Sequence, residues 1–286
     1  MSDISLNISG KIELPIVKLY QNVSEVSAAL EIPFIVVGAS ARDIVLHYGH
    51  GASVERATQD IDFGIEVPDW SAFQKLKQSL ADRGFQEAAT AHRMMSPNNI
   101  PIDIVPFGDI EDEQSSIAWP PAGDRKMSVL GFQEVCANAE IVRIQEDPPV
   151  DIPVASPAGM TILKLIAWLD RVIELRGRDA TDLAYLLANY EKLPQVSEHL
   201  YRDQKLMEQH GWDLTLASAH QLGADAGELA GSASYALIAN FFKGEHDKLN
   251  TEKLLGEMGK SNTASYERHE ALLNACIEGF IAIHKY

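Results

Sequence analysis

The hydrophobic pattern of the chain changes once, near Pro157, and this change limits the fold more than any other feature. Before it, short apolar runs and segments of alternating polarity are typical of β-strands, with helical segments between them. After it, apolar residues recur every three or four positions, which is typical of α-helices. We therefore predict an α+β protein, with a mixed sheet flanked by helices over residues 1–155 and an α-helical domain over residues 156–286. The Pro-rich segment 146–157 marks the expected boundary.

A strand, a turn, a helix and a second strand are predicted in order over residues 34–67. The apolar run FIVV ends at the small-residue turn Gly38-Ala39-Ser40, and a short helix is expected from there to Gly49. The strand that follows alternates four apolar residues with three acids and a glycine: Ile61, Phe63, Ile65 and Val67 against Asp60, Asp62, Gly64 and Glu66. This alternation predicts that the acidic residues share one face of the strand.

Period-two geometry places the carboxylates of Asp60 and Asp62 side by side. Two like charges at this distance repel unless a positive charge lies between them. A third carboxylate, Asp103, lies in the middle of another short apolar strand, IPIDIVPFG. If the two strands are neighbours, three carboxylates converge, and hard oxygen ligands with open positions suit Mg²⁺. The alternative is an ordinary half-solvated sheet whose acids face water.

The Gly38-Ala39-Ser40 turn predicts an anion site, because it lies where a strand gives way to a helix. Backbone N–H groups and the positive end of a helix attract phosphate there, and the Ser40 hydroxyl adds a donor. Gly38 permits a tight turn and the close approach of a ligand. Such turns are common, so the prediction depends on the two aspartates that follow.

With these residues the sequence resembles the polymerase-β-like nucleotidyltransferase superfamily. The signature of that superfamily is a strand, a Gly-Gly or Gly-Ser turn, a helix, a strand carrying Asp-x-Asp, and a third carboxylate on a later strand. The matching residues are Gly38 and Ser40, then Asp60 and Asp62, then Asp103. The chain departs from the signature because Ala39 separates Gly from Ser, and because HYGHGASVERATQ lengthens the interval before the aspartates.

Within the superfamily the sequence is most similar to the AbiEii-type nucleotidyltransferases, which are toxins of bacterial toxin–antitoxin systems. The segment ILKLIAWLDRVIELRGRDATDLAYLL resembles their helical motif. The resemblance implies that Lys164 and Arg171, on one helical face, bind the nucleotide phosphates. Asp179 and Asp182 would start the next helix and support the site. The alternative is that Arg171, Arg178, Asp179 and Asp182 form an ion network at the helix ends.

A partial second resemblance concerns GASARD, which is similar to the GGxxRD motif of tRNA nucleotidyltransferases of the CCA-adding kind. It implies that Arg42 contacts the triphosphate and that Asp43 pairs with Arg42 or begins the helix. The later motifs of that family do not occur in this sequence. His47, His50 and His92 lie near the same segments, and we interpret them as surface or core residues because their spacing is not that of metal ligands.

The resemblance implies a metal-dependent nucleotidyltransferase that moves NMP from an NTP to an acceptor hydroxyl and releases pyrophosphate. Asp60, Asp62 and Asp103 would be the catalytic residues and the ligands of two Mg²⁺ ions, while Gly38, Ala39 and Ser40 would bind the NTP. The acceptor is open: a tRNA end, a protein or a small molecule. A toxin-like member would have an antitoxin partner. The alternative is a nucleotide-binding or interaction protein that keeps the fold without transferase activity.

The net charge of the chain limits the classes of molecule that it is expected to bind. The formal net charge of −17 disfavours duplex DNA, because affinity for phosphate backbones comes largely from Lys and Arg. No segment has the pattern of a membrane span or a secretory signal, so we expect a cytoplasmic bacterial protein without a membrane partner. Cys136 and Cys276 lie far apart and are predicted to be buried apolar residues.

Overall fold

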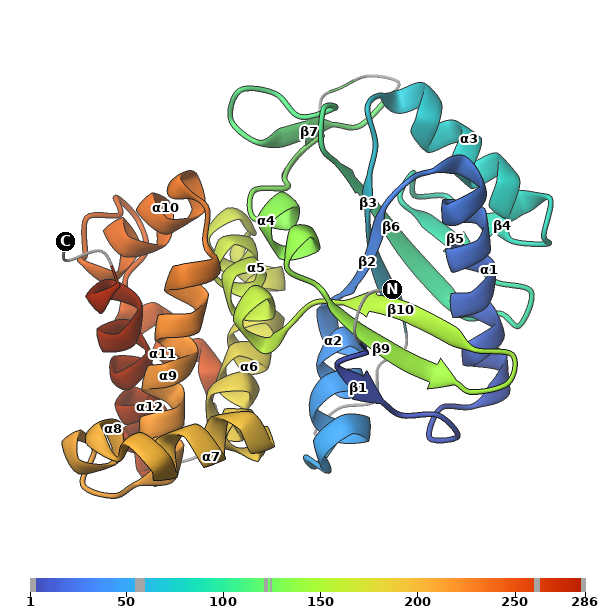
Figure 1. The fold of residues 1–286 in the computed structure, drawn as a ribbon. Helices are drawn as coiled ribbons and strands as arrows, with labels where there is room; N and C mark the ends of the chain where they lie inside the picture. The colour runs from blue at the N-terminus through green and yellow to red at the C-terminus, as the bar shows by residue number, and fades with distance from the viewer. Residues whose placement is uncertain (1–3, 55–59, 121–122, 124, 260–262, 284–286) are drawn as a thin grey trace. The chain divides into compact units, whose positions relative to one another are not determined.

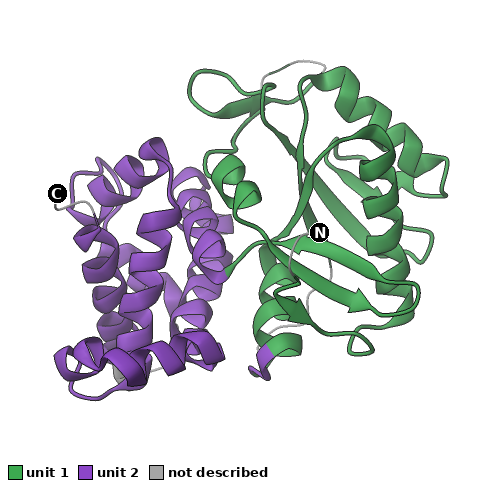
Figure 2. Cartoon of the chain, viewed as in Figure 1, with its two compact units in different colours: residues 1–49, 53–156 green, residues 50–52, 157–286 purple. Residues whose placement is uncertain are grey.

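The computed structural model describes residues 4–54, 60–120, 123, 125–259 and 263–283. The chain divides into two compact units (Figure 2), which we call unit 1 (residues 1–49 and 53–156) and unit 2 (residues 50–52 and 157–286). All strands of the described chain belong to unit 1, and unit 2 is helical where it is described. The predicted α+β architecture is therefore confirmed. Residues 55–59, which end the long interval before Asp60, lie outside the described residues.

Unit 1 is built on a mixed eight-stranded sheet with the order β1-β9-β10-β2-β3-β6-β5-β4 (Figure 1). The strands are β1 (Leu6–Asn7), β2 (Phe34–Val37), β3 (Ile61–Glu66), β4 (Gln86–Glu87), β5 (Arg93–Met95), β6 (Pro101–Phe107), β9 (Glu140–Gln145) and β10 (Val150–Val154). A separate hairpin pairs β7 (Ser116–Ala118) with β8 (Lys126–Ser128). At the centre β2 runs antiparallel to β3, and β3 runs parallel to β6. The strands predicted from the apolar runs around 34, 61 and 102 are thus neighbours.

The helices of unit 1 are α1 (Leu14–Leu30), α2 (Gly38–Arg42), the π-helix η1 (Asp43–Gly49), α3 (Trp70–Ala81) and α4 (Phe132–Ala137). They cover both faces of the sheet. On one face Tyr20 of α1 packs edge-on against Phe63 of β3, with ring centroids 5.9 Å apart. On the other face Phe132 of α4 lies so close to Gly64 that an added Cβ would be 2.8 Å from its ring. Successive residues of β3 therefore face α1 and α4 in turn, as period-two geometry requires.

The helix α1 was not part of the sequence expectation, although its pattern is present. Pro15 lies in the first turn, where a missing N–H is tolerated, and Val17, Tyr20 and Val23 are buried at three-residue spacing.

The Pro-rich segment 146–157, expected as a domain boundary, is not simply a linker. Its residues 150–154 form β10, which alternates buried and half-buried side chains and lies between β9 and β2.

Unit 2 is a helical bundle. Its elements are α5 (Pro157–Asp170), α6 (Ile173–Asn189), the 3₁₀ helix η2 (Tyr190–Lys192), α7 (Pro194–Asp203), α8 (Lys205–Gln209), α9 (Leu214–Leu229), α10 (Ser232–Phe242), α11 (Thr251–Met258) and α12 (Thr263–Ala282). The helical segment 197–211 is broken at Gln204, whose φ is 59°. In the part of the chain that is described, no helix is long and apolar enough to cross a bilayer.

One helix boundary in unit 2 corrects the sequence expectation. Asp179 and Asp182 were expected to start a helix, but α6 already begins at Ile173, so both lie inside it. Helix α5 ends at Asp170, and Arg171 follows it with its N–H bonded to the Ala167 carbonyl at 3.0 Å. The break between the helices therefore falls directly after Arg171 rather than before Asp179.

Candidate active site

Two of the predicted carboxylates face each other across neighbouring strands. In the parallel pair β3 and β6, Asp62 is the register partner of Asp103. Asp60 directly precedes β3 and is half-buried, as are Asp62 and Asp103. Ile61, Phe63 and Ile65, which alternate with the acids, are buried. The sequence pattern thus separates one polar face from one core face, and the neighbouring strand adds its carboxylate to the polar face.

The Gly38 turn lies directly against Asp62. Its φ is +70°, and an added Cβ would lie 2.1 Å from Asp62 Oδ2 and 2.9 Å from Asp62 Cγ. Val37, the last residue of β2, is the register partner of Asp62 in the antiparallel pair. Both the backbone conformation and the space require glycine here. The turn and the aspartate, which the sequence linked only by resemblance, are therefore in contact.

The Ser40 hydroxyl is held inside the turn. It is buried and donates to the Val37 carbonyl oxygen at 3.2 Å. It also shares a hydrogen bond with the Tyr20 hydroxyl from α1. Burial raises the pKa of Tyr20 well above its ordinary value, and the carboxylates of Asp62 and Asp43 add to this effect, so the phenol stays protonated. Helix α1 is thus attached to the turn by a neutral hydrogen bond.

Arg93 supplies a positive charge between two of the carboxylates. It is the register partner of Asp103 in the antiparallel pair of β5 and β6. Its Nε and Nη2 donate to Asp103 Oδ1 and Oδ2, each at 2.7 Å, and Nη2 also donates to Asp60 Oδ2 at 2.9 Å. These bonds, with Asp103 as the main partner, raise the pKa of Arg93 further. Neighbouring carboxylates need a positive charge between them, and for Asp60 and Asp103 the guanidinium of Arg93 provides it.

Sequence reasoning missed Arg93. The only local signal was an arginine in the strand-like segment AHRMMS, and its pairing with Asp103 depends on a register that one strand does not encode.

His92, interpreted from the sequence as a surface or core residue, lies with its Nε2 4.0 Å from Asp103 Oδ1 and its ring against Trp119. Burial lowers the pKa of His92, so its imidazole is neutral near pH 7.

Arg42 and Asp43 form the pair that the sequence suggested. Both are buried, and Arg42 Nε and Nη2 donate to Asp43 Oδ1 at 3.0 and 2.8 Å. The pair lies where α2 passes into the π-helix η1. Contact between Arg42 and a triphosphate remains a prediction, since a guanidinium held this way would have to exchange partners.

In unit 2 the predicted phosphate-binding cations lie in an ion cluster. Lys164 Nζ is 3.1 Å from Asp179 Oδ1 and 2.7 Å from Asp182 Oδ2, and Arg171 Nη1 is 2.6 Å from Asp179 Oδ2. Burial would lower the pKa of Lys164, but Asp182 and Asp179 together outweigh it and the pKa is raised. The alternative network is therefore present in part: Arg171 pairs with Asp179 and Arg178 is exposed, while Lys164 pairs with both aspartates.

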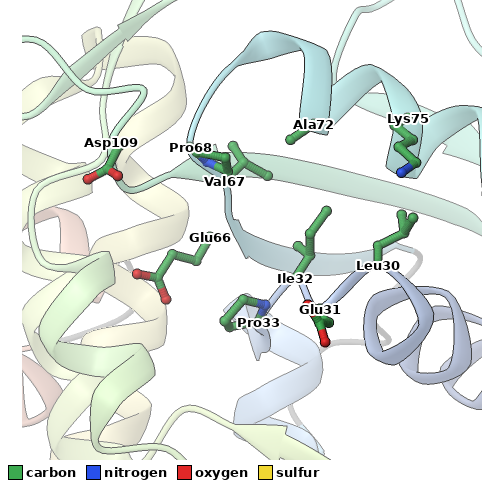
Figure 3. A pocket seen from close by; sticks show the side chains of 10 residues that line it. All are labelled: Leu30, Glu31, Ile32, Pro33, Glu66, Val67, Pro68, Ala72, Lys75 and Asp109. Atoms are coloured by element: carbon green, nitrogen blue, oxygen red, sulfur yellow. The ribbon is translucent and has the colours of Figure 1, made fainter.

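A hollow of about 430 Å³ lies elsewhere in unit 1 (Figure 3). Its lining comes from the end of α1, the start of α3 and the far end of β3, and comprises Leu30, Glu31, Ile32, Pro33, Glu66, Val67, Pro68, Ala72, Lys75 and Asp109. Glu66 ends β3, whereas Asp60 precedes its start. The hollow is therefore at the opposite end of β3 from Asp60, and we do not assign it to the carboxylate site.

Comparison with solved structures gives matches of low similarity. The solution structure of the antibiotic-resistance factor ANT(2″)-Ia is 12% identical with a TM-score of 0.36, and the match covers 70% of this chain and 98% of that one. The Bradyrhizobium diazoefficiens CD-NTase CdnG in complex with GTP is 12% identical with a TM-score of 0.33, and the match covers 98% of this chain and 90% of that one. The Thermotoga maritima CCA-adding enzyme complexed with tRNA is 13% identical with a TM-score of 0.26, and the match covers 96% of this chain and 82% of that one.

A search of curated proteins found no match. The family assignment comes instead from the sequence itself, because residues 24–271 match the family model described as "Nucleotidyl transferase AbiEii toxin, Type IV TA system". This match includes the Gly38 turn, all three carboxylates and the ion cluster of unit 2. It extends well past the segment on which the sequence resemblance was based. The chain belongs to the AbiEii nucleotidyltransferase family.

Proposed function

We propose that this nucleotidyltransferase moves a nucleoside monophosphate from an NTP to an acceptor hydroxyl in a Mg²⁺-dependent reaction. The observation that carries the proposal is the position of Asp62, which lies against the Gly38 turn on one side and opposite Asp103 on the other. A phosphate-binding turn and a pair of carboxylates are thus adjacent. Phosphoryl-transfer enzymes need these two functions next to each other.

The donor set fits Mg²⁺. Asp62 lies beside Asp103 on neighbouring strands, and Asp60 and Asp103 share the guanidinium of Arg93. Carboxylate oxygens are the ligands that Mg²⁺ takes alongside water and phosphate. Asp60, Asp62 and Asp103 would hold the metal, which when bound supplies positive charge to the triphosphate and the acceptor oxygen. Before substrate binds, Arg93 offsets part of the negative charge of Asp60 and Asp103.

The reaction then proceeds in line at the α-phosphorus. The acceptor oxygen forms a bond to the α-phosphorus, the bond to the bridging oxygen breaks, and pyrophosphate leaves with the electron pair. Asp103, whose side chain is 16% exposed, accepts the hydroxyl proton. Backbone N–H groups of the Gly38-Ala39-Ser40 turn bind the phosphates beyond the broken bond.

The family resemblance adds Arg42, Lys164 and Arg171 as further phosphate contacts. Each of them is paired with a carboxylate: Arg42 with Asp43, and the other two with Asp179. A role in binding therefore requires that the cation exchange its carboxylate for a phosphate or bind both. Measurement of the KM for NTP in a Lys164→Met variant tests this role directly.

The function is tested with NTPs labelled at the α-phosphate. The purified chain is incubated with each NTP, Mg²⁺ and a cell extract, and the RNA, protein and small-molecule fractions are separated. We expect label in one fraction together with pyrophosphate release, and neither in an Asp60→Asn/Asp62→Asn variant. Asp112→Asn, which changes an exposed carboxylate of unit 1, is the control. Metal-dependent NTP binding without pyrophosphate release would overturn the proposal and favour a binding protein.

We further propose that the protein acts as a toxin, held in check by an antitoxin partner. Membership of a toxin family supports this. Expression of the wild-type chain should arrest growth, whereas the Asp60→Asn/Asp62→Asn variant should not, and co-expression of the neighbouring gene should restore growth. Equal toxicity of the wild type and the variant would separate any growth effect from nucleotidyl transfer.

A further inference from the structure

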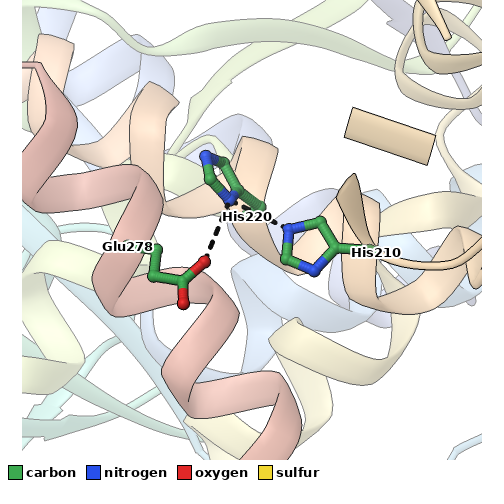
Figure 4. Close-up of side chains that lie close together, drawn as sticks. All are labelled: His210, His220 and Glu278. Carbon is green, nitrogen blue, oxygen red and sulfur yellow. Dashed lines mark hydrogen bonds and ion pairs between the residues drawn. The ribbon is translucent and has the colours of Figure 1, made fainter. Parts of the chain in front are cut away.

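A second cluster of metal-ligating side chains lies in unit 2 and has no part in the proposed transfer reaction. It consists of His210, His220 and Glu278 (Figure 4), whose ligand atoms all lie within 4.8 Å of one another. His210 Nε2 is 3.0 Å from His220 Nδ1, and His220 Nδ1 is 3.9 Å from Glu278 Oε2. Among the described residues this is the one group of three such side chains at this spacing. The ligands come from three different places in the chain.

The close crossing of α9 and α12 positions two of the three ligands. A Cβ added at Gly279 would lie 2.0 Å from the His220 carbonyl oxygen, and one added at Gly223 would lie 1.9 Å from the Cys276 carbonyl oxygen. The two helix backbones therefore touch at two points flanking His220 and Glu278. Contact at this distance fixes the separation of the helices, because any side chain at either glycine would force them apart.

The third ligand is held by a tight turn between α8 and α9. His210 is the residue directly after α8, and the next two residues, Gly211 and Trp212, both have positive φ, at 62° and 65°. A bulky residue rarely adopts this backbone region, so the turn is maintained at a conformational cost. Asp213 caps α9 and is bound at 2.6 and 2.9 Å by Arg268 of α12. The turn that carries His210 is thus attached to the helix that carries Glu278.

We propose that His210, His220 and Glu278 bind a divalent transition-metal ion of the Zn²⁺ class. Two imidazoles and one carboxylate are a common protein ligand set for Zn²⁺, whereas Mg²⁺ and Ca²⁺ take oxygen ligands. In a tetrahedral site with Zn–N bonds of about 2.0–2.1 Å, two ligand atoms lie about 3.3 Å apart. The observed 3.0 Å between the histidine nitrogens is close to this value. Glu278, whose side chain is 58% exposed, leaves the fourth position to water.

The short distance between the two histidine nitrogens, 3.0 Å, also has an interpretation without a metal. The competing interpretation is a simple hydrogen bond between two neutral imidazoles, with one ring donating and the other accepting. Only a direct measurement of metal binding distinguishes the two.

Zinc binding is measured by calorimetry on the full chain after removal of metals with EDTA. We expect one Zn²⁺ per chain, bound equally by the wild type and by the Asp60→Asn/Asp62→Asn variant, which separates this site from the carboxylates of unit 1. His220→Gln should weaken Zn²⁺ binding by about 100-fold or more and Glu278→Gln by about 10-fold. His199→Gln, which changes an exposed histidine of α7, is the matched control and should bind like the wild type.

Circular dichroism and thermal unfolding in metal-free buffer establish that each variant is folded. If His220→Gln does not fold, His210→Gln, at an equally half-buried residue, and Glu278→Gln, at an exposed one, decide the question. Wild-type affinity in the histidine variants would overturn the proposal. So would the absence of Zn²⁺ binding tighter than about 10 μM by the wild-type chain, because a site built from three protein ligands should exceed that affinity.

Discussion

The two charged clusters that the family resemblance assigned to nucleotide binding differ in their charge balance. In unit 1 the guanidinium of Arg93 is shared by Asp60 and Asp103, and Asp62 is the register partner of Asp103 on the next strand. In unit 2 the two cations Lys164 and Arg171 pair with two carboxylates, Asp179 and Asp182. Among these described side chains, the first cluster has three carboxylates to one cation, and the second has two to two. An excess of charge at a half-exposed site attracts a counter-ion, whereas a balanced and buried set satisfies itself.

The carboxylates of the two clusters also differ in their exposure to solvent. Asp60 is 39% exposed through its side chain and Asp103 16%, whereas Asp179 is 1% exposed and Asp182 4%. Water and ligands can therefore reach the first cluster far more easily than the acids of the second. We therefore expect the unit 1 cluster to bind a ligand from solution, and we expect the unit 2 cluster to stabilise the packing of α5 on α6 even if its cations also contact phosphate.

The largest expected effect follows from removing one carboxylate of the first cluster. Asp62→Asn or Asp103→Asn should lower the rate of pyrophosphate release by about 10³-fold or more, about 4 kcal/mol, because the metal loses a ligand at the reacting phosphate. Thermal unfolding should change little for Asp62→Asn, whose side chain is half-buried, and more for Asp103→Asn, because the two hydrogen bonds from Arg93 lose their charged acceptor. Asp112→Asn should retain full activity. A wild-type rate in either variant would show that the carboxylate pair on β3 and β6 is not the catalytic centre.

The second cluster should respond in stability rather than in catalysis. Asp179→Asn removes the buried carboxylate that Lys164 shares with the partly exposed Arg171, and should lower the free energy of unfolding by about 3 kcal/mol. The kcat of the folded variant should stay near that of the wild type. Asp203→Asn, which removes an exposed pair with Lys205, should change stability by less than about 1 kcal/mol. A stable variant with a raised KM for NTP would instead assign this cluster to phosphate binding.

Local patterns identified the strands of the site because each strand carries its own signal. Apolar runs and alternation around residues 34, 61 and 102 predicted β2, β3 and β6 without knowledge of their partners. The contact between Asp62 and Gly38 followed from two such strands being neighbours. Arg93 could not be inferred in this way, because its role depends on the register of β5 against β6.

The missed strand β10 shows a conflict between two local signals. Val150, Ile152 and Val154 alternate as in a half-buried strand, but Pro153 and the prolines just before the strand favour a linker. The tertiary structure resolves the conflict. β10 is in register with β2 only at Val154, so Pro153 lies where the ladder with that neighbour is incomplete. The zinc cluster was missed for a different reason: its ligands are 10 and 58 residues apart, outside any short motif.

A smaller effect is expected from Gly38→Ala. The new methyl group would meet the Asp62 carboxylate, and the backbone would be held at a φ of +70° that alanine rarely adopts. We expect destabilisation of about 2 kcal/mol together with reduced kcat, because Asp62 must move. Gly10→Ala is the matched control, since its φ is +78° and nothing lies within 4 Å of the added Cβ. It should show the conformational cost alone, with kcat unchanged. An equal loss of activity in both variants would contradict a specific role for the Gly38 contact.

The smallest expected effect is on Mg²⁺ affinity and follows from removing Arg93, the cation of the first cluster. Arg93 donates to Asp60 and Asp103, the same oxygens that Mg²⁺ would use, so guanidinium and metal compete for them. Arg93→Met should therefore tighten Mg²⁺ binding by about fivefold, or about 1 kcal/mol, measured by calorimetry in the absence of NTP. Arg83→Met, which removes a solvent-exposed partner of Glu25, should leave Mg²⁺ binding unchanged. Weaker Mg²⁺ binding in Arg93→Met would mean that the guanidinium positions the carboxylates for the metal rather than competing with it, and the charge excess of the first cluster would then not be what attracts Mg²⁺.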